Sequence, residues 1–216
     1  MSPDSRVGPL KVAIATGRNH RSEEHYGPPA RMGIMARIPY VDPEDLPAER
    51  RELVVSALQD RPLHVYRALG TNDDVLAGLR EYFGTLWTDT GLSTREREVV
   101  ILTVAGAIDS DYEWHQHVRI ARGEGFDDAT IAAIGAGRFE ELSEPEASLA
   151  RYARAVVDRS VDDALHAAIA EHYDDETIVG TAALATAYQG LGGIIDALDL
   201  ELEAGETFFG WDPRAE

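Results

Sequence analysis

A glutamate and a histidine four residues apart are the residues in this sequence whose types and spacing best suit chemistry. They are Glu113 and His117, within the segment SDYEWHQHVRIARGEG that starts at Ser110. Residues i and i+4 of an α-helix share a face, so the carboxylate and the imidazole can exchange a hydrogen bond or a proton. The spacing therefore predicts a proton-transfer pair on one face of a helix.

Each member of this pair also has a structural interpretation. Glu113 stands three residues after Ser110, where a glutamate is the natural N3 residue of a helix capping box. His117 lies beside Val118 and Ile120, which is typical of a half-buried histidine that only supports packing. At the level of sequence both alternatives stay open.

A metal site is not predicted. Glu113, His115 and His117 lie within five residues, but histidines at i and i+2 diverge on a helix, whereas the zinc-protease pattern has them at i and i+4. His115 points about 160° away from Glu113 on a helical wheel, so we expect it at the surface or at an interface. The sequence also lacks a glycine-rich phosphate loop and a serine nucleophile elbow.

The absence of cysteine excludes sulfur-based chemistry more firmly than any other feature of the sequence excludes a function. With no cysteine among its 216 residues, the chain cannot form disulfides, thiolate metal sites or a thiol-based redox cycle.

The net charge of the chain limits the classes of molecule that it is expected to bind. There are 39 acidic residues against 20 basic ones, which gives a formal charge of −19. Such a chain repels phosphate backbones and anionic membranes, so neither nucleic acid nor a membrane is an expected partner. The acidic residues are spread along the chain, which indicates a halophilic cytoplasm, because molar salt shortens the Debye length to about 3 Å and screens self-repulsion.

One segment has the length of a membrane span. Residues 177–195 carry no charge, but they include four glycines, three threonines and Gln189 and have acidic flanks. We therefore expect a buried core helix. The early apolar run Val12 to Ala15 is too short for a signal peptide, and a cytoplasmic location is predicted.

The elements that must position these residues are predicted to be helical. Residues 1–34 are rich in Gly, Pro, Arg, Ser and His and are expected to be a mobile extension. Residues 35–216 are expected to form a single all-helical domain, and its 44% hydrophobic content suffices for one core.

Several local signals place the helix starts. The pattern S-x-x-E occurs at Ser93, Ser110 and Ser143, and each predicts a capping box that opens a helix. Helical spacing of apolar residues continues from about residue 42, with further helices expected at 161–173 and 175–188. Glycines at 190–193 are expected to interrupt the last helix, and the small residues of 180–193 would let another helix approach closely. An all-helical bundle is therefore predicted.

The segment LSTREREVVILTVAGAIDSDYEWHQHVRIARGEGFDDATIAAI, from Leu92 to Ile134, closely resembles the carboxymuconolactone decarboxylase family, which shares its helical fold with alkylhydroperoxidase D. The opening MARIPYVDPEDLP, from Met35, is similar to the usual start of such proteins. The resemblance covers about four fifths of the chain. It implies an all-α, alkylhydroperoxidase D-like helical bundle that assembles with copies of itself as a trimer or hexamer.

The peroxidase branch of that family uses a C-x-x-C pair, a histidine after it and a glutamate before it. On this chain the cysteine positions fall on Ser110 and Glu113, the histidine on His117 and the glutamate on Glu98. The resemblance thus implies a proton relay of Glu98, Glu113 and His117 without the redox pair, so the chain is not expected to be a thiol peroxidase. An exposed charge in the first turns of a helix is the alternative interpretation of Glu98.

The decarboxylase branch implies chemistry that needs no cofactor, because a carboxylated unsaturated lactone contains its own electron sink. Such an enzyme stabilises a delocalised anion and returns a proton to carbon. The resemblance implies that His117 donates this proton, while Glu113 or Glu98 orients the imidazole and raises its pKa.

Substrate binding is the remaining role. Arg95, one turn before Glu98, is the candidate to hold the substrate, and Tyr112 and Trp114 are further candidates for contact with it. Arg119 and Arg122 are expected to face solvent.

The functional expectation follows from this resemblance. It is a cofactor-free protein that acts on a small carboxylated or lactone-like compound by proton transfer or decarboxylation, which in the second case makes it a carboxy-lyase. The alternative is a non-catalytic, oligomeric small-molecule-binding or interaction protein with the same fold.

Overall fold

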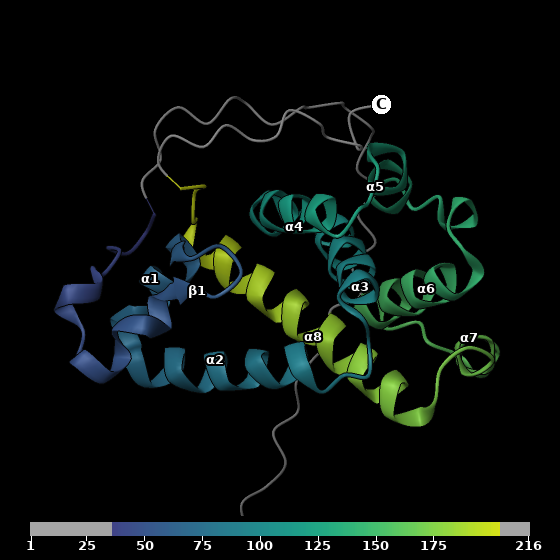
Figure 1. The fold of residues 1–216 in the computed structure, drawn as a ribbon, viewed down its shortest axis with the longest axis horizontal. Helices are drawn as coiled ribbons and strands as arrows, with labels where there is room; N and C mark the ends of the chain where they lie inside the picture. The colour runs from purple at the N-terminus through teal and green to yellow at the C-terminus, as the bar shows by residue number, and fades with distance from the viewer. Residues whose placement is uncertain (1–35, 204–216) are drawn as a thin grey trace, which may run out of the picture. The chain divides into compact units, whose positions relative to one another are not determined.

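A computed structural model of the protein describes residues 36–203, and the extension expected at 1–34 lies outside the described residues. The described part is helical, as Figure 1 shows, and the predicted all-α class is confirmed. Its α-helices are α1 (His64–Leu69), α2 (Asp73–Thr88), α3 (Thr94–Ala107), α4 (Asp111–Gly123), α5 (Asp128–Gly135), α6 (Glu144–Asp158), α7 (Asp163–Ala170) and α8 (Asp175–Leu198).

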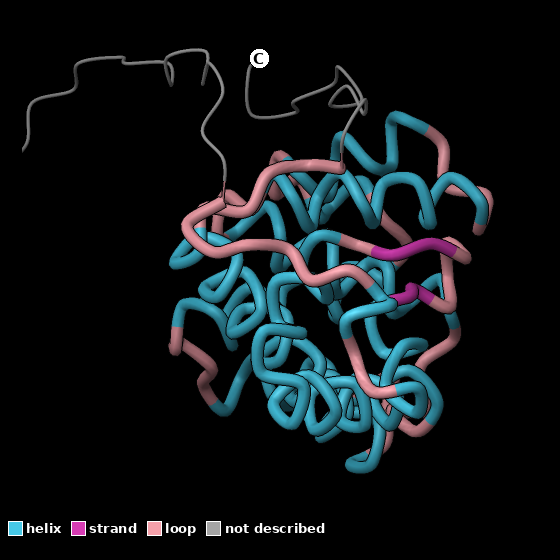
Figure 2. The backbone as a smooth tube through the Cα atoms, turned by 90° about the vertical axis from the view of Figure 1, so that its left-hand side faces the viewer, coloured by secondary structure: helices cyan, strands magenta, loops and turns pink. Residues whose placement is uncertain are grey.

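Short elements precede and link these helices. Four 3-10 turns span Pro43–Asp45, Ala48–Val54, Gly70–Asn72 and Phe139–Glu141. Two short strands, β1 (Val55–Ser56) and β2 (Arg61–Pro62), pair antiparallel. Figure 2 shows these strands, in magenta, side by side against the helices. The segment before α1 was expected to form an α-helix, but its prolines and its hairpin turn divide it into these shorter pieces.

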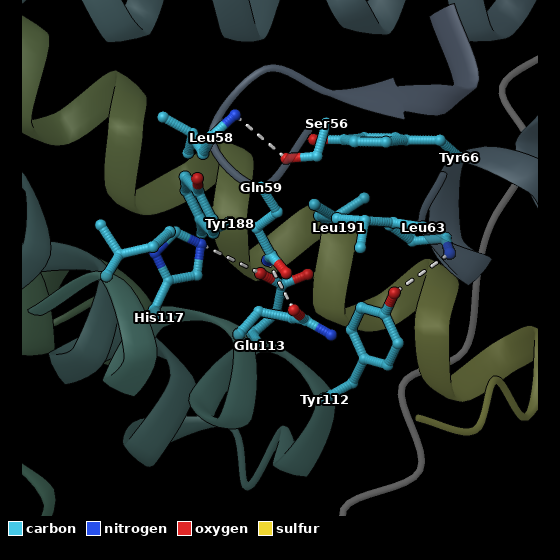
Figure 3. Close-up of a pocket in the computed structure, with 13 residues that line it drawn as sticks. Ser56, Leu58, Gln59, Leu63, Tyr66, Tyr112, Glu113, His117, Tyr188 and Leu191 are labelled. Atoms are coloured by element: carbon cyan, nitrogen blue, oxygen red, sulfur yellow. Dashed lines mark hydrogen bonds and ion pairs between the residues drawn. The ribbon is translucent and has the colours of Figure 1, made fainter. Parts of the chain in front are cut away.

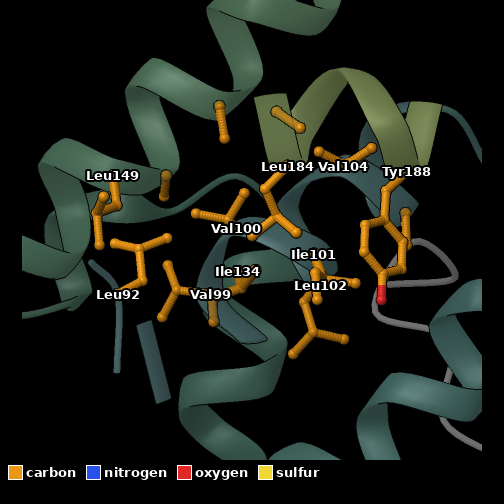
Figure 4. Close-up of a cluster of buried hydrophobic side chains, with 14 of the residues drawn as sticks. Leu92, Val99, Val100, Ile101, Leu102, Val104, Ile134, Leu149, Leu184 and Tyr188 are labelled. Carbon is orange, nitrogen blue, oxygen red and sulfur yellow. The ribbon is translucent and has the colours of Figure 1, made fainter. Parts of the chain in front are cut away.

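Helix α3 lies at the centre of the core. Its residues from Val99 to Leu102 and Val104 are fully buried, and α4, α5, α6 and α8 all pack against it. Figure 4 shows Leu149 and Leu184 from α6 and α8 meeting this helix. Residues 97–105 of α3 are all buried, and a helix packed on every side is held in place, so a polar side chain in this stretch has a fixed position.

The start of α3 agrees with the sequence. The Ser93 hydroxyl accepts a hydrogen bond from the backbone N–H of Glu96 at 3.3 Å, and the Glu96 carboxylate accepts one from the N–H of Ser93 at 2.8 Å. Both arms of the predicted capping box are therefore present.

The other two predicted capping boxes form only in part. At Ser110 the hydroxyl accepts from the backbone N–H of Glu113 at 3.5 Å. At Ser143 the hydroxyl donates to the Glu146 carboxylate at 2.6 Å and caps no backbone group. The helices α4 and α6 nevertheless begin directly after these serines, as predicted.

The prediction that glycines interrupt the last helix is wrong. Helix α8 runs without interruption from Asp175 to Leu198, through all the glycines that were expected to break it. The reason is packing, because a Cβ on Gly180 would lie 2.6 Å from the carbonyl oxygen of Thr90 and one on Gly192 would lie against Ile108. Gly180 and Gly192 thus admit close neighbours, whereas Gly190 and Gly193 have nothing within 4 Å of a Cβ, and the helical backbone continues through all four.

By length and composition α8 is the one described helix that could cross a membrane. In the structure it packs against α2, α3, α6 and α7 (Figure 1), and Leu184, Ala185 and Tyr188 join the buried core. It therefore has the contacts of a core helix, as predicted.

Two glycine substitutions on α8 test this packing. Gly180→Ala is expected to destabilise the protein by about 1–3 kcal/mol, since its methyl group has no space beside the Thr90 backbone. Gly193→Ala is the matched control, because nothing lies within 4 Å of its Cβ and alanine favours a helix over glycine by about 1 kcal/mol. Urea unfolding measures both, and equal effects would contradict the proposed contact.

Candidate functional site

Helices α3 and α4 bring three titratable side chains together. Glu98 lies in α3, and Glu113 and His117 lie one turn apart on α4. All three are buried, with 0%, 4% and 5% of their surfaces exposed. The link at residues 108–110 turns the chain so that α4 packs against α3. The alternative of an exposed Glu98 is therefore wrong.

The imidazole of His117 lies between the two carboxylates. Its Nδ1 is 2.9 Å from Oε2 of Glu98, and its Nε2 is 3.6 Å from Oε2 of Glu113. The Tyr188 ring meets the imidazole edge to face, with the ring centres 5.0 Å apart. When Nδ1 donates its proton to Glu98, the orientation and tautomer of the ring are set, and Nε2 faces Glu113.

Two of these three side chains line a small pocket. It has a volume of about 40 Å³ and is enclosed by the hairpin turn, α1, α4 and α8. Figure 3 shows Glu113, His117 and Gln59 pointing toward one another around it. Glu98 is not among its lining residues and lies behind the imidazole. The lining residues are Ser56, Leu58, Gln59, Leu63, Val65, Tyr66, Tyr112, Glu113, Gln116, His117, Ile120, Tyr188 and Leu191.

The pocket lies where two hydrophobic clusters meet. Tyr188 belongs to the cluster around α3, while Leu63, Val65 and Leu191 belong to a second cluster around α1. Polar side chains also line the pocket. Burial of the titratable pair strengthens the charge interaction between its members.

Burial and neighbouring charges shift the pKa values of Glu113 and His117, the two titratable groups that face the pocket. Burial raises the pKa of Glu113 to about 7, although the charge of His117 opposes this and the charges of Glu98 and Glu203 add to it. Burial alone would lower the pKa of His117, but the charge and hydrogen bond of Glu98 outweigh burial and raise it. Near neutral pH the pair therefore holds a proton that it can give or take.

These raised pKa values predict how stability depends on pH. The folded chain binds more protons at this site than the unfolded chain does, so the stabilisation is present at low pH and is lost as pH rises through about 7. The free energy of unfolding of the wild type, relative to Glu113→Gln, should fall by about 1–3 kcal/mol between pH 5 and pH 8. Urea unfolding at fixed ionic strength measures this, and parallel curves for the two proteins would contradict it.

A third carboxylate, Glu203, holds the wall of the pocket in place. Glu203 accepts hydrogen bonds from the Tyr112 hydroxyl at 2.6 Å, the Gln116 amide at 2.7 Å and the backbone N–H of His64 at 2.8 Å. Burial would raise the pKa of Glu203, but the hydrogen bonds from Tyr112 and the His64 backbone outweigh burial and lower it. Glu203 is thus an ionised anchor and not a proton carrier. Sequence reasoning missed it because it lies 87 residues from Gln116 and follows no local pattern.

The sequence-predicted binding residues separate in space. Tyr112 lines the pocket. Arg95 is not among the lining residues, because it pairs with Glu146 at 2.7 Å and covers the ring of Phe126. Trp114 is buried in the core and does not line the pocket. The structure thus brings neither Arg95 nor Trp114 to the proton-transfer pair.

The predicted position of His115 is also wrong. His115 was expected at the surface or at an interface, but only 2% of it is exposed. Helix α4 is covered on more than one side, so the face opposite Glu113 is also buried; residues 112–118 are all buried. In residues 36–203, no group of three or more His, Asp or Glu side chains is arranged to hold a metal ion.

Comparison with known proteins gives a family match for part of the chain. Residues 73–155 match the model of the Carboxymuconolactone decarboxylase family. This range contains α2 to α5, most of α6, and Glu98, Glu113 and His117. No curated protein is significantly similar to the chain.

Solved structures share the fold. An alkylhydroperoxidase AhpD core protein, an uncharacterized peroxidase-related protein from Ralstonia eutropha JMP134, is 18% identical with a TM-score of 0.71, over 80% of this chain and 95% of that one. The debrominase Bmp8 is 17% identical with a TM-score of 0.68, and the match covers 82% of this chain and 93% of Bmp8. An uncharacterized peroxidase-related protein from Silicibacter sp. TM1040 is 16% identical with a TM-score of 0.68, and the match covers 76% of this chain and 89% of that protein. At these identities the likeness concerns the fold.

Proposed function

Because residues 73–155 belong to the carboxymuconolactone decarboxylase family, we propose that the protein is a cofactor-independent enzyme. It transfers a proton to a carbon of a small carboxylated or lactone-like compound, with decarboxylation as the leading reaction. The observation that carries this proposal is His117 held between two buried carboxylates at a small pocket.

The proposed roles follow from the position of each side chain. Glu98 is a positioning residue, because it contacts Nδ1 of His117 and lies outside the pocket. His117 and Glu113 both face the pocket, and they share the proton that reaches the substrate. Since the pKa of Glu113 is about 7, either member of the pair can act as the acid near neutral pH.

The proposed reaction balances without an oxidant or a metal. The bond between the substrate carbon and its carboxylate breaks, carbon dioxide leaves, and the electron pair spreads toward the conjugated carbonyl group. The acid form of the His117–Glu113 pair then delivers its proton to carbon, and water restores it. Hydrogen-bond donors that face the pocket stabilise the developing negative charge.

One protein with a similar fold binds a small ring compound. A debrominase Bmp8 variant, 18% identical with a TM-score of 0.60, has been solved in complex with 2,3,4-tribromopyrrole. This chain has no cysteine, so we do not extend dithiol peroxide reduction to it. Proton transfer by the carboxylate and imidazole groups is the chemistry that its own residues support.

A panel of carboxylated butenolides and unsaturated dicarboxylates tests the proposal. The wild type should release carbon dioxide from at least one compound, and Glu113→Gln should lower that rate by about 10²-fold or more. Binding without turnover of any compound would contradict the enzyme proposal and favour the non-catalytic alternative.

The assembly and the location stay predictions. Light scattering in molar salt is expected to give a trimer or a hexamer, and a monomer or dimer would contradict this expectation. The same solutions test the halophilic interpretation, because the unfolding temperature should rise steeply with salt when the charge of −19 is screened.

A further inference from the structure

Tyr188 brings to the pocket a hydroxyl group that no protein group engages. The residue lies on α8, lines the pocket and is 6% exposed. Among the described residues 36–203, none forms a hydrogen bond with its oxygen, and no dashed line reaches that oxygen in Figure 3. A buried tyrosine hydroxyl usually has a partner. This one is left for a molecule that enters the pocket.

The other two tyrosines of the pocket lining have partners. The hydroxyl of Tyr112 donates to Glu203 at 2.6 Å. The hydroxyl of Tyr66 has a hydrogen bond with Arg80, whose guanidinium carbon also lies 4.5 Å from the centre of the Tyr66 ring. Tyr188 is therefore the pocket tyrosine whose hydroxyl the protein does not hold.

The ring of Tyr188 also contacts the proton-transfer pair. It meets the imidazole of His117 edge to face, with the ring centres 5.0 Å apart, and Glu98 sets the orientation of that imidazole. Tyr188 is held in turn by the hydrophobic cluster around α3. Since the pocket has a volume of only about 40 Å³ and Glu113 lines it as well, a molecule in it lies close to the hydroxyl and to both members of the pair.

The charges around the pocket create a need for a neutral hydrogen-bond donor. No lysine or arginine of the described residues lines the pocket, whereas Glu113 does, and Glu98 lies behind the imidazole. Negative charge that develops on a bound molecule is repelled by these carboxylates. Burial, followed by the charge of Glu113, raises the pKa of Tyr188 well above its usual range. Its hydroxyl thus stays protonated near neutral pH and can donate a hydrogen bond.

We propose that Tyr188 is a catalytic residue whose hydroxyl donates a hydrogen bond to the substrate oxygen on which negative charge develops. The inference rests on the proposed function and assigns one more residue to the same site. His117 and Glu113 transfer the proton while Tyr188 keeps its own, so the bonds that form and break are those given above. A preorganised donor of this kind contributes about 10²–10³-fold to a rate.

Binding of two five-membered ring compounds to the full chain tests this assignment. At pH 6 cyclopentane-1,3-dione is an anion whose charge is shared by two oxygens, and 2-cyclopentenone is its neutral counterpart. The wild type should bind the dione more tightly. Tyr188→Phe keeps the ring and removes only the hydroxyl. It should weaken dione binding by about 10–100-fold and cyclopentenone binding by about 5-fold or less, because a hydrogen bond to a charged acceptor is the stronger one.

Stability separates a catalytic role from a structural one. The unfolding temperature of Tyr188→Phe should not fall, because the lost hydroxyl has no partner among residues 36–203. Tyr112→Phe should unfold at a lower temperature, because it takes a donor from Glu203 and an acceptor from the backbone N–H of Val65. A Tyr188→Phe protein with a lower unfolding temperature and unchanged dione affinity would show that the hydroxyl is structural.

Tyr152→Phe is the matched control. Tyr152 is 7% exposed and belongs to the same hydrophobic cluster as Tyr188, but it does not line the pocket. Its variant should bind both compounds as the wild type does. The inference is overturned by wild-type dione affinity in Tyr188→Phe, by an equal loss for both compounds, or by a wild type that does not prefer the dione.

Turnover distinguishes this inference from the proposed function. With any compound from which the wild type releases carbon dioxide, Tyr188→Phe should lower kcat by about 10²–10³-fold. If turnover depends on His117 while Tyr188→Phe matches the wild type in rate and dione affinity, the inference is wrong and the enzyme proposal stands. If dione binding depends on Tyr188 and no compound is turned over, the enzyme proposal is wrong and the donor site stands.

Discussion

Replacing His117 by glutamine is expected to lower the rate of proton transfer by about 10²–10⁴-fold, the usual contribution of a general acid. Glutamine is chosen because its amide can still donate to Glu98, whereas alanine would leave a carboxylate buried without a partner. The loss should appear in kcat, with substrate affinity nearly unchanged. Steady-state kinetics and binding of the same compound measure the two effects separately.

The control for this substitution is His166→Gln. His166 is an exposed histidine on α7, a helix that contributes no residue to the pocket. It should turn over substrate as the wild type does. A His117→Gln protein with wild-type turnover would show that the imidazole only supports packing, which is the alternative that the sequence left open.

Replacing Glu98 by alanine is expected to cause the largest loss of stability, about 3–5 kcal/mol, because it removes one partner of a buried ion pair. Glu98→Gln keeps a hydrogen-bonding group of the same size and should cost about 1 kcal/mol. In that variant the pKa of His117 should fall, since burial lowers it and the charge of Glu98 no longer raises it.

Two measurements check this prediction. Urea unfolding gives the stability of both variants, with Glu81→Ala as an exposed control on α2. An NMR titration of the His117 ring in Glu98→Gln gives the direction of the pKa change. An unchanged or higher pKa of His117 would rule out Glu98 as its orienting charge.

Glu98, Glu113 and His117 were predictable because their signals are local or lie in one family segment. Glu113 and His117 share a helix face by their spacing alone, and Ser93 and Ser110 open their helices with short-range hydrogen bonds. Glu98 was reached through the resemblance, at a position inside the matched range of 73–155. Spacing alone did not distinguish a buried Glu98 from an exposed one.

The walls of the pocket were not predictable in the same way. Gln59 and Glu203 lie outside the family range. Both contact Gln116 on α4, from which Gln59 is separated by 57 positions in the sequence and Glu203 by 87. Long-range pairs of this kind leave no periodic pattern in one sequence. The continuous course of α8 was also missed, because helix propensity counts glycine as a breaker while tertiary packing uses Gly180 and Gly192 as close contacts.

The proposal that His117 and Glu113 pass a proton to carbon has one direct test. The wild type, incubated in D₂O with the compound from which it releases carbon dioxide, should place one deuterium on the product carbon that lost the carboxylate, as measured by mass spectrometry. His117→Gln, with its fold and binding intact, should slow this incorporation by about 10²-fold or more. Equal incorporation by the two proteins, or product without deuterium at that carbon, would contradict the account.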